Sequence, residues 1–136
     1  MDGTVRSTMT ERARDEGLDD ACGITQYGAP EVDIEQIEAM LANDPANEGL
    51  LDIAAFTYYS AGQLEKALLT YQRLLALDQR SPVYHYCLGN TYYRLHRDAE
   101  AYQEWHMTIR VDQEGGRYAR RARKRLELVG AAGAGR

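Results

Sequence analysis

The feature that most constrains the fold of this chain is a pattern of residues that returns at a fixed interval. The segment 54–58 corresponds to 88–92, and the segment 67–71 corresponds to 101–105. A self-match at a fixed period of about 34 residues is typical of proteins built from repeated helical hairpins. We call this interval the repeat period, and we predict an all-α fold in which such hairpins stack on one another.

Apolar residues recur at spacings of three and four along six segments, which predicts six helices that each bury one face. Two pairs form hairpins, because only two or three residues separate their members. The first helix belongs to an incomplete leading unit, and the residue before Pro45 ends it. The predicted helices are 31–42, then 48–61 with 64–77, then 82–95 with 98–111, and finally 117–129.

Small residues recur where the two helices of each hairpin are expected to cross. Gly89 and Ala101 are examples, and helices approach to the short end of the usual interaxial range of about 8–10 Å only when small side chains meet. Arg123 stands one repeat period after Gly89. An arginine is tolerated at that position when no partner helix follows, so we predict that the last helix caps the array.

The charge of the chain divides it into parts. Residues 1–48 contain 12 acids and 3 bases, a net −9, whereas residues 117–136 contain 1 acid and 7 bases, a net +6. Residues 1–30 are punctuated by glycine and contain few large apolar residues, which favours a flexible extension. We predict a repeat domain over residues 31–129 and a flexible tail over residues 130–136.

Composition also limits the location of the protein. No run of about 18 apolar residues is present, so no membrane span is predicted, and the N-terminus does not resemble a secretory signal. Cys22 and Cys87 lack metal or redox spacing, which favours free thiols in a reducing compartment. Arginine far outnumbers lysine, as in GC-rich bacterial genomes, and we therefore expect a bacterial cytoplasmic protein.

The repeated residues resemble those of the tetratricopeptide repeat (TPR) family over residues 31–129. Leu88, Gly89, Tyr92, Ala101 and Trp105 match the family pattern in one repeat, and their counterparts one period earlier match in the other. The chain departs from the pattern at four positions, which are Gln79, Gln113, His85 and Ala54. The resemblance implies a right-handed α-α superhelix of two full repeats, a leading half-repeat helix and a C-terminal capping helix. It also implies a concave groove, lined by the first helix of each unit, that binds a peptide or partner protein.

Aligning the first helices in register predicts which side chains line that groove. The surface is aromatic at its N-terminal end and cationic at its C-terminal end, although aromatic stripes on helices are also typical of a core. An amide there could hydrogen-bond a peptide backbone in both directions, and arginines could bind a carboxylate with two nitrogens. The predicted site residues are Asp52, Phe56, Tyr59, Tyr86, Asn90, Tyr93, Arg94, Arg120, Arg121 and Lys124.

Asp52 and Phe56 stand where some family members carry a Lys–Asn pair that holds the C-terminal carboxylate of heat-shock chaperones. That ligand is therefore not predicted. No nucleophile motif, phosphate-binding glycine loop or metal-ligand spacing is present, and Asp44, Asp78 and Asp112 are too far apart for an acid–base pair. We expect no enzyme activity, no cofactor and no metal, and we expect these aspartates to order the turns between repeats.

The favoured function is that of an adaptor whose partner is a protein or peptide, acidic and bearing aromatic residues; self-association is left open. A second hypothesis is a small chaperone of secreted proteins, because residues 59–63 and the following helix resemble, more loosely, type III secretion chaperones with tetratricopeptide repeats. A third hypothesis, nucleic-acid binding by the basic segment 118–125, is disfavoured by the acidic N-terminal third. The sequence further suggests that the acidic extension competes with the partner for the cationic end of the groove.

Overall fold

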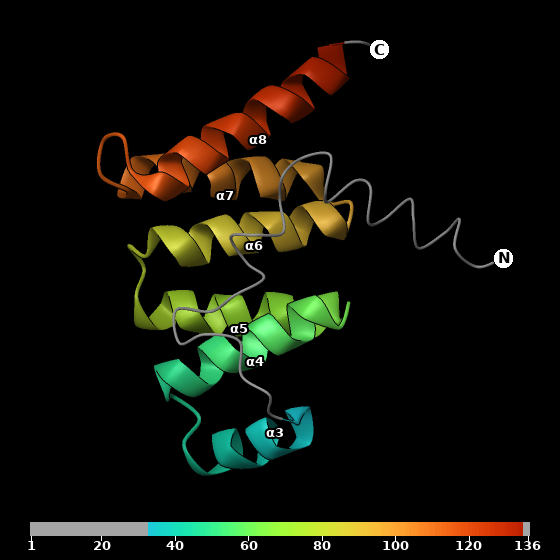
Figure 1. Cartoon of the computed structure of the whole chain (residues 1–136), viewed down its shortest axis with the longest axis vertical. Coiled ribbons are helices and arrows are strands. Elements are labelled where there is room, and N and C mark those ends of the chain that lie inside the picture. The colour runs from blue at the N-terminus through green and yellow to red at the C-terminus, as the bar shows by residue number, and fades with distance from the viewer. Residues whose placement is uncertain (1–32, 135–136) are drawn as a thin grey trace, which may run out of the picture.

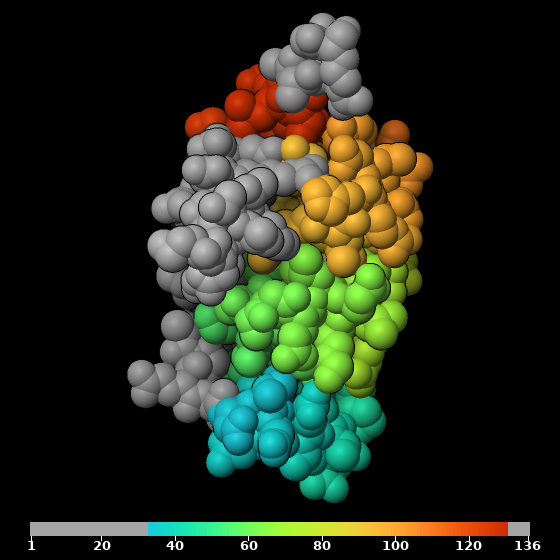
Figure 2. All heavy atoms as spheres, turned by 90° about the vertical axis from the view of Figure 1, so that its right-hand side faces the viewer, coloured from blue at the N-terminus to red at the C-terminus, as the bar shows by residue number. Residues whose placement is uncertain are grey.

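The computed structural model describes residues 33–134, with side chains through residue 130, and this part of the chain contains helices and no strands. The helices stack in chain order along the longest axis of the molecule (Figure 1). A view turned by 90° shows the same order without a break between the layers (Figure 2). The prediction of an all-α helical repeat is thus confirmed. The helices are α3 (Ile34–Asn43), α4 (Glu48–Ser60), α5 (Leu64–Leu77), α6 (Pro82–Arg94), α7 (Asp98–Val111) and α8 (Arg117–Ala134).

The helix bounds follow local signals. α5 and α7 have the predicted bounds, whereas α3 begins only at Ile34, because Asp33 is its N-cap and its Oδ1 accepts from the N–H of Glu35 at 3.3 Å. The last helix was predicted to end at Val129 but continues to Ala134. Residues 130–134 are alanine and glycine without a proline, and alanine has the highest helix propensity.

The N-caps repeat with the period of the sequence. Oδ1 of Asn47 accepts from the N–H of Leu50 at 3.0 Å, and Oγ of Ser81, one period later, accepts from the N–H of Tyr84 at 3.3 Å. At α8 the same task falls to Asp112, whose Oδ2 accepts from the N–H groups of residues 118 and 119 at 3.1 and 2.9 Å. Each cap satisfies helix donors that have no partner within their own helix.

The three aspartates spaced by the repeat period each form the C-cap of a second helix. Oδ2 of Asp44 accepts from Nδ2 of Asn47 at 3.0 Å, and Oδ1 of Asp78 accepts from the N–H of Arg80 at 3.3 Å. Asp112 caps the next helix, as described above. The prediction that these carboxylates order the turns between repeats is therefore confirmed.

The two helices of the α6–α7 hairpin meet at a glycine. A Cβ atom added to Gly89 would lie 2.6 Å from the Trp105 ring and 3.3 Å from the backbone oxygen of Ala101. In the α4–α5 hairpin, Ala55 and Ala67 are both 0% exposed. The close approach predicted from the small residues is thus confirmed.

The helix α8 packs on α7 and α6 through its buried residues Ala119, Ala122 and Val129. Arg123 is exposed, and no further helix of the described residues follows α8 in the stack. This arrangement agrees with the prediction that α8 ends the array.

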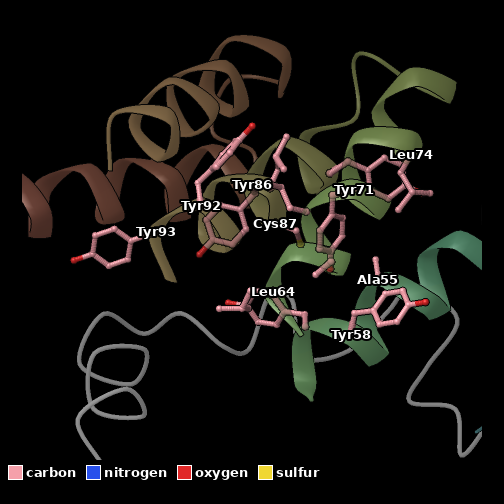
Figure 3. Packing of buried hydrophobic residues seen from close by; sticks show 14 of the residues in the cluster. Ala55, Tyr58, Leu64, Tyr71, Leu74, Tyr86, Cys87, Tyr92 and Tyr93 are labelled. Carbon is pink, nitrogen blue, oxygen red and sulfur yellow. The ribbon is translucent and has the colours of Figure 1, made fainter. Parts of the chain in front are cut away.

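Tyrosines join successive repeats at the same register. The Tyr58 hydroxyl of α4 donates to the Glu38 carboxylate of α3, and one period later the Tyr92 hydroxyl of α6 accepts from Nε2 of Gln72 of α5 at 3.2 Å. These tyrosines belong to one core cluster that also includes residues of α5 (Figure 3). The repeats therefore share a continuous core.

Cys87, in the middle of α6, is disulfide-bonded. The expectation of a free thiol is wrong at this position, because cysteine spacing along the sequence does not show which segments meet in space. A disulfide-bonded Cys87 does not favour a reducing compartment, which was one basis for expecting a cytoplasmic protein. Cys22 and the predictions made for residues 1–30 lie outside the described residues.

Candidate functional site

The ten predicted site residues lie on three helices that occupy equivalent positions in the stack. We call the surface formed by α4, α6 and α8 the first-helix face. α4 carries Asp52, Phe56 and Tyr59, and α8 carries Arg120, Arg121 and Lys124. The other four residues, which come from α6, are Tyr86, Asn90, Tyr93 and Arg94.

The structure brings Tyr59 and Arg94 together across the gap between repeats. The guanidinium carbon of Arg94 lies 4.7 Å from the centre of the Tyr59 ring, and Nη1 donates to the Tyr59 backbone oxygen at 3.3 Å. Burial raises the pKa of the Tyr59 phenol, and the positive charge of Arg94 offsets part of that rise. A hydrogen bond from the Arg94 side chain also lowers the pKa of the Tyr59 phenol, and the hydroxyl oxygen and Nε of Arg94 are both buried. Arg94, which is half-buried, retains hydrogen-bonding capacity on the first-helix face.

Tyr86 is held by an arginine that the sequence analysis did not select. Its hydroxyl accepts from Nε of Arg125 at 3.1 Å, and its ring centre lies 5.8 Å from that of Tyr118. Arg125 is 1% exposed, and its guanidinium also lies 5.9 Å from the Trp105 ring.

Arg125 stands in register with Thr57 and Thr91, whose hydroxyls bond to backbone oxygens of their own helices. This break in the repeat, an arginine in place of a buried threonine, is the sequence signal that could have identified Arg125. A long cationic side chain at a position that is small in the preceding units must find its partners in neighbouring helices.

Asn90 and Tyr93 face the second helix of their own hairpin. Oδ1 of Asn90, a residue that is 0% exposed, accepts from Nε1 of Trp105 at 3.1 Å. The Tyr93 ring centre lies 5.5 Å from that of Trp105. The amide oxygen of Asn90, which was expected to accept from a bound peptide, is therefore engaged by Trp105.

The cationic end of the face is accessible on α8. Arg120 and Lys124 are exposed, and Nη1 of Arg120 donates to the Gly115 backbone oxygen. Arg121 is half-buried, and its guanidinium lies 5.7 Å from the ring centre of Tyr118. Three positive charges thus lie along one helix at the C-terminal end of the stack.

The aromatic end of the face is mostly packed. Tyr59, Tyr86 and Tyr93 belong to the core cluster, and Asp52 is 8% exposed, whereas Phe56 is half-buried. Asp52 also lies near Tyr71: burial raises the pKa of the Tyr71 phenol well above its usual value, and the negative charge of Asp52 adds to that rise. The site residues with exposed surface are Phe56, Arg94, Arg120, Arg121 and Lys124.

One histidine is engaged inside the α6–α7 hairpin. Nδ1 of His85 lies 2.8 Å from Oε1 of Glu104, and Nε2 lies 2.9 Å from the backbone oxygen of Gln79. Burial lowers the pKa of His85, but the hydrogen bonds to Glu104 and Gln79, with the negative charges of Glu104 and Asp78, outweigh burial and raise it above 6.5. Both partners are acceptors, so they favour the imidazolium form.

Residues 33–134 contain no cluster of three or more His, Cys, Asp or Glu side chains able to hold a metal ion. In the same residues, no helix combines the length and the apolar character needed to cross a membrane.

Comparison with known proteins agrees with this architecture. A family model described as "TPR repeat" matches residues 57–95, which cover the end of α4, all of α5 and all of α6. No curated protein matches the chain. The match falls on the segment where one hairpin passes into the next, and the helices on either side continue in the same register. Over residues 57–95 the chain is therefore similar to the tetratricopeptide repeat family.

Proposed function

We propose that this protein is a non-enzymatic adaptor that binds a peptide segment of a partner protein on its first-helix face. Tetratricopeptide repeats generally mediate interactions between proteins and are typically not catalytic. The adaptor role, the choice of face and the chemistry of the partner are our proposal, argued from the side chains of α4, α6 and α8.

The observation that carries the proposal is the Tyr59–Arg94 pair. A buried guanidinium N–H without an acceptor, here Nε of Arg94, costs free energy unless a partner supplies the acceptor. Arg94 is half-buried, and a carboxylate of a bound peptide would accept from its guanidinium, because an arginine that lies on an aromatic ring keeps its N–H edge available. The half-buried Phe56, three residues before Tyr59, offers an apolar contact beside this pair.

The positively charged residues of α8 can bind further acidic groups of the same peptide. Arg120, Arg121 and Lys124 provide positive charge one repeat further along the face, which favours a peptide with a second acidic group. An acidic segment with an aromatic residue therefore fits the face best. Such a partner would place its aromatic side chain near α4 and an acidic residue near α8.

The test uses fluorescently labelled synthetic peptides that combine Asp or Glu with Phe or Trp, and measures binding by fluorescence anisotropy. The protein is the full chain with Cys22→Ser, so that no disulfide within one chain can form. We expect binding that the triple reversal Arg120→Glu, Arg121→Glu and Lys124→Glu weakens at least tenfold. Arg94→Ala should weaken binding as well, with helicity unchanged by circular dichroism.

A matched control is the triple reversal Lys66→Glu, Arg73→Glu and Arg110→Glu, which changes one lysine and two arginines on the second helices α5 and α7. It should leave affinity within about twofold, the scale of rim charges that do not contact the ligand. Equal losses in the two triple reversals would contradict the proposed face. Binding that ignores peptide sequence and extends equally to single-stranded DNA would instead favour the nucleic-acid hypothesis. Co-purification with one unstable secreted protein would favour the chaperone.

A further inference from the structure

Cys87 lies on the first-helix face and is already bonded to another sulfur. It occupies the register position of Ile53 in α4 and of Arg121 in α8, between the α6 residues Tyr86 and Leu88. It is 3% exposed and disulfide-bonded. The sequence contains two cysteines, and the other one is Cys22.

We propose that a Cys22–Cys87 disulfide holds the acidic segment around Cys22 on the first-helix face, so that reduction of this bond opens the face to its partner. The inference rests on the function proposed above and adds its regulation. The occupant is residues 15–22 of the same chain. The switch is a thiol–disulfide exchange at Cys87.

The length of the chain permits this arrangement. Ten residues, 23–32, separate Cys22 from Asp33, the first described residue, and an extended stretch of that length spans about 35 Å. The path from α3 to α6 crosses at most three helix–helix spacings of about 8–10 Å each, about 30 Å in total. Cys22 therefore reaches Cys87 without disturbing the stack.

Charge supports the same occupant. Residues 15–22 contain four acids, Asp15, Glu16, Asp19 and Asp20, and no base. A disulfide at Cys22 places Asp19 and Asp20 within about 16 Å of Cys87, since each residue spans up to about 3.5 Å and a disulfide separates its two Cα atoms by about 5.5 Å. Arg121 is the counterpart of Cys87 in the next first helix, and its side chain is partly exposed. The segment thus offers the carboxylates that the face is proposed to bind in a partner.

Reduction of the Cys22–Cys87 disulfide requires a thiol reductant such as glutathione. A thiolate of the reductant attacks one sulfur of the disulfide, forms a mixed disulfide and releases the other cysteine as a thiolate that takes up a proton. A second reductant thiol then resolves the mixed disulfide. Two reductant thiols become one oxidised disulfide, and Cys22 and Cys87 both become thiols.

The connectivity is tested on the full chain purified without reductant. Digestion with trypsin under non-reducing conditions, followed by mass spectrometry, should give one linked pair of peptides that contain Cys22 and Cys87. Addition of dithiothreitol should release both peptides. A disulfide-linked dimer, or alkylation of both cysteines without prior reduction, would overturn the inference.

Binding of residues 15–22 to the first-helix face is tested by titrating the disulfide against reduced and oxidised glutathione. The equilibrium gives the effective concentration of Cys22 at Cys87, which rises when the segment binds the face. Arg121→Glu with Lys124→Glu should lower this concentration about tenfold, since each exposed ion pair contributes a factor of a few and reversal adds repulsion. The matched pair Arg110→Glu with Lys66→Glu on the second helices should change it less than twofold. Equal effects of the two double reversals would overturn the inference that residues 15–22 bind the first-helix face.

The regulatory step is tested with the peptide that binds best in the assay of the proposed function. The oxidised wild-type chain should bind it at least tenfold more weakly than the Cys22→Ser chain, and reduction of the wild type should restore binding. Equal affinity of the oxidised and reduced wild type would overturn the switch. If no peptide binds to either chain, both the proposed function and its regulation fail. The linked peptides and the glutathione titration still test, independently of any peptide, the disulfide and the contact of residues 15–22 with the first-helix face.

Discussion

Nε1 of Trp105 donates a hydrogen bond of 3.1 Å to Oδ1 of Asn90, and both side chains are 0% exposed. This bond joins α7 to α6 within one hairpin, on the side of α6 that also carries Gly89. The residue that was expected to hold a peptide thus fixes the orientation of the indole ring. The indole in turn determines how closely the two helices approach.

Asn90→Ala should destabilise the protein by about 1–3 kcal/mol, because the buried indole N–H loses its acceptor. The measurement is chemical denaturation followed by circular dichroism. Gln103→Ala, at an exposed position of α7, is the matched control and should change the free energy of unfolding by less than about 0.5 kcal/mol. A wild-type-like stability of Asn90→Ala would show that the bond contributes little.

Substitution at the helix crossing should be costly only where the helices touch. A Cβ atom at Gly89 would meet the Trp105 ring at 2.6 Å, so Gly89→Leu should cost about 1–3 kcal/mol or more. Arg123→Leu, its counterpart one period later on the exposed side of α8, should be nearly neutral or promote self-association. Unfolding midpoints and analytical ultracentrifugation separate these results. Similar losses of stability in both variants would contradict the assignment of α8 as a cap.

The two hairpin turns share a left-handed residue at the same register. Gly62 has φ = 78°, and His96, one period later, has φ = 60°. Glycine adopts this conformation at little cost, whereas a side chain does so at about 1 kcal/mol. We therefore expect His96→Gly to stabilise the protein by up to about 1 kcal/mol and Gly62→Ala to destabilise it by a similar amount, as measured by thermal unfolding. If His96→Gly instead destabilises the protein, other contacts of His96 outweigh the cost of its left-handed backbone conformation.

Stability should depend on pH through His85. Its pKa is raised in the folded state, so folding binds a proton that the unfolded chain releases above about pH 6.5. The stabilisation is fully present below that pH and is lost as the pH rises through the folded value. The free energy of unfolding of the wild type should therefore fall relative to that of His85→Gln as the pH increases from about 6 upward.

Glu104→Gln provides the control for this pH dependence. It removes the carboxylate 2.8 Å from Nδ1 of His85 but keeps a hydrogen-bond acceptor. The free energy of unfolding of Glu104→Gln is compared with that of the double variant Glu104→Gln with His85→Gln. We expect this difference to change less with pH than the difference between the wild type and His85→Gln. A pH profile that Glu104→Gln leaves unchanged would assign the effect to another titrating group.

The sequence by itself determined the parts of this protein that repeat. The repeat period predicted the helices, the small residues at the crossing near Gly89, the aspartates at the turns and the cap at α8. These features follow from contacts between near neighbours in the chain, which every unit makes in the same way. A periodic pattern therefore contains enough information to assign them.

The tertiary structure decided what does not repeat. Arg125 replaces a buried threonine and reaches Tyr86 and Trp105 in two other helices, and His85 pairs with Glu104 of the neighbouring helix. Tyr59, Tyr86 and Tyr93, predicted to line a groove, are members of the core cluster, and Cys87 is not a free thiol. Each of these outcomes depends on which side chain fills the space between particular helices, and a helical period gives the face of a residue but not the neighbour that it meets there.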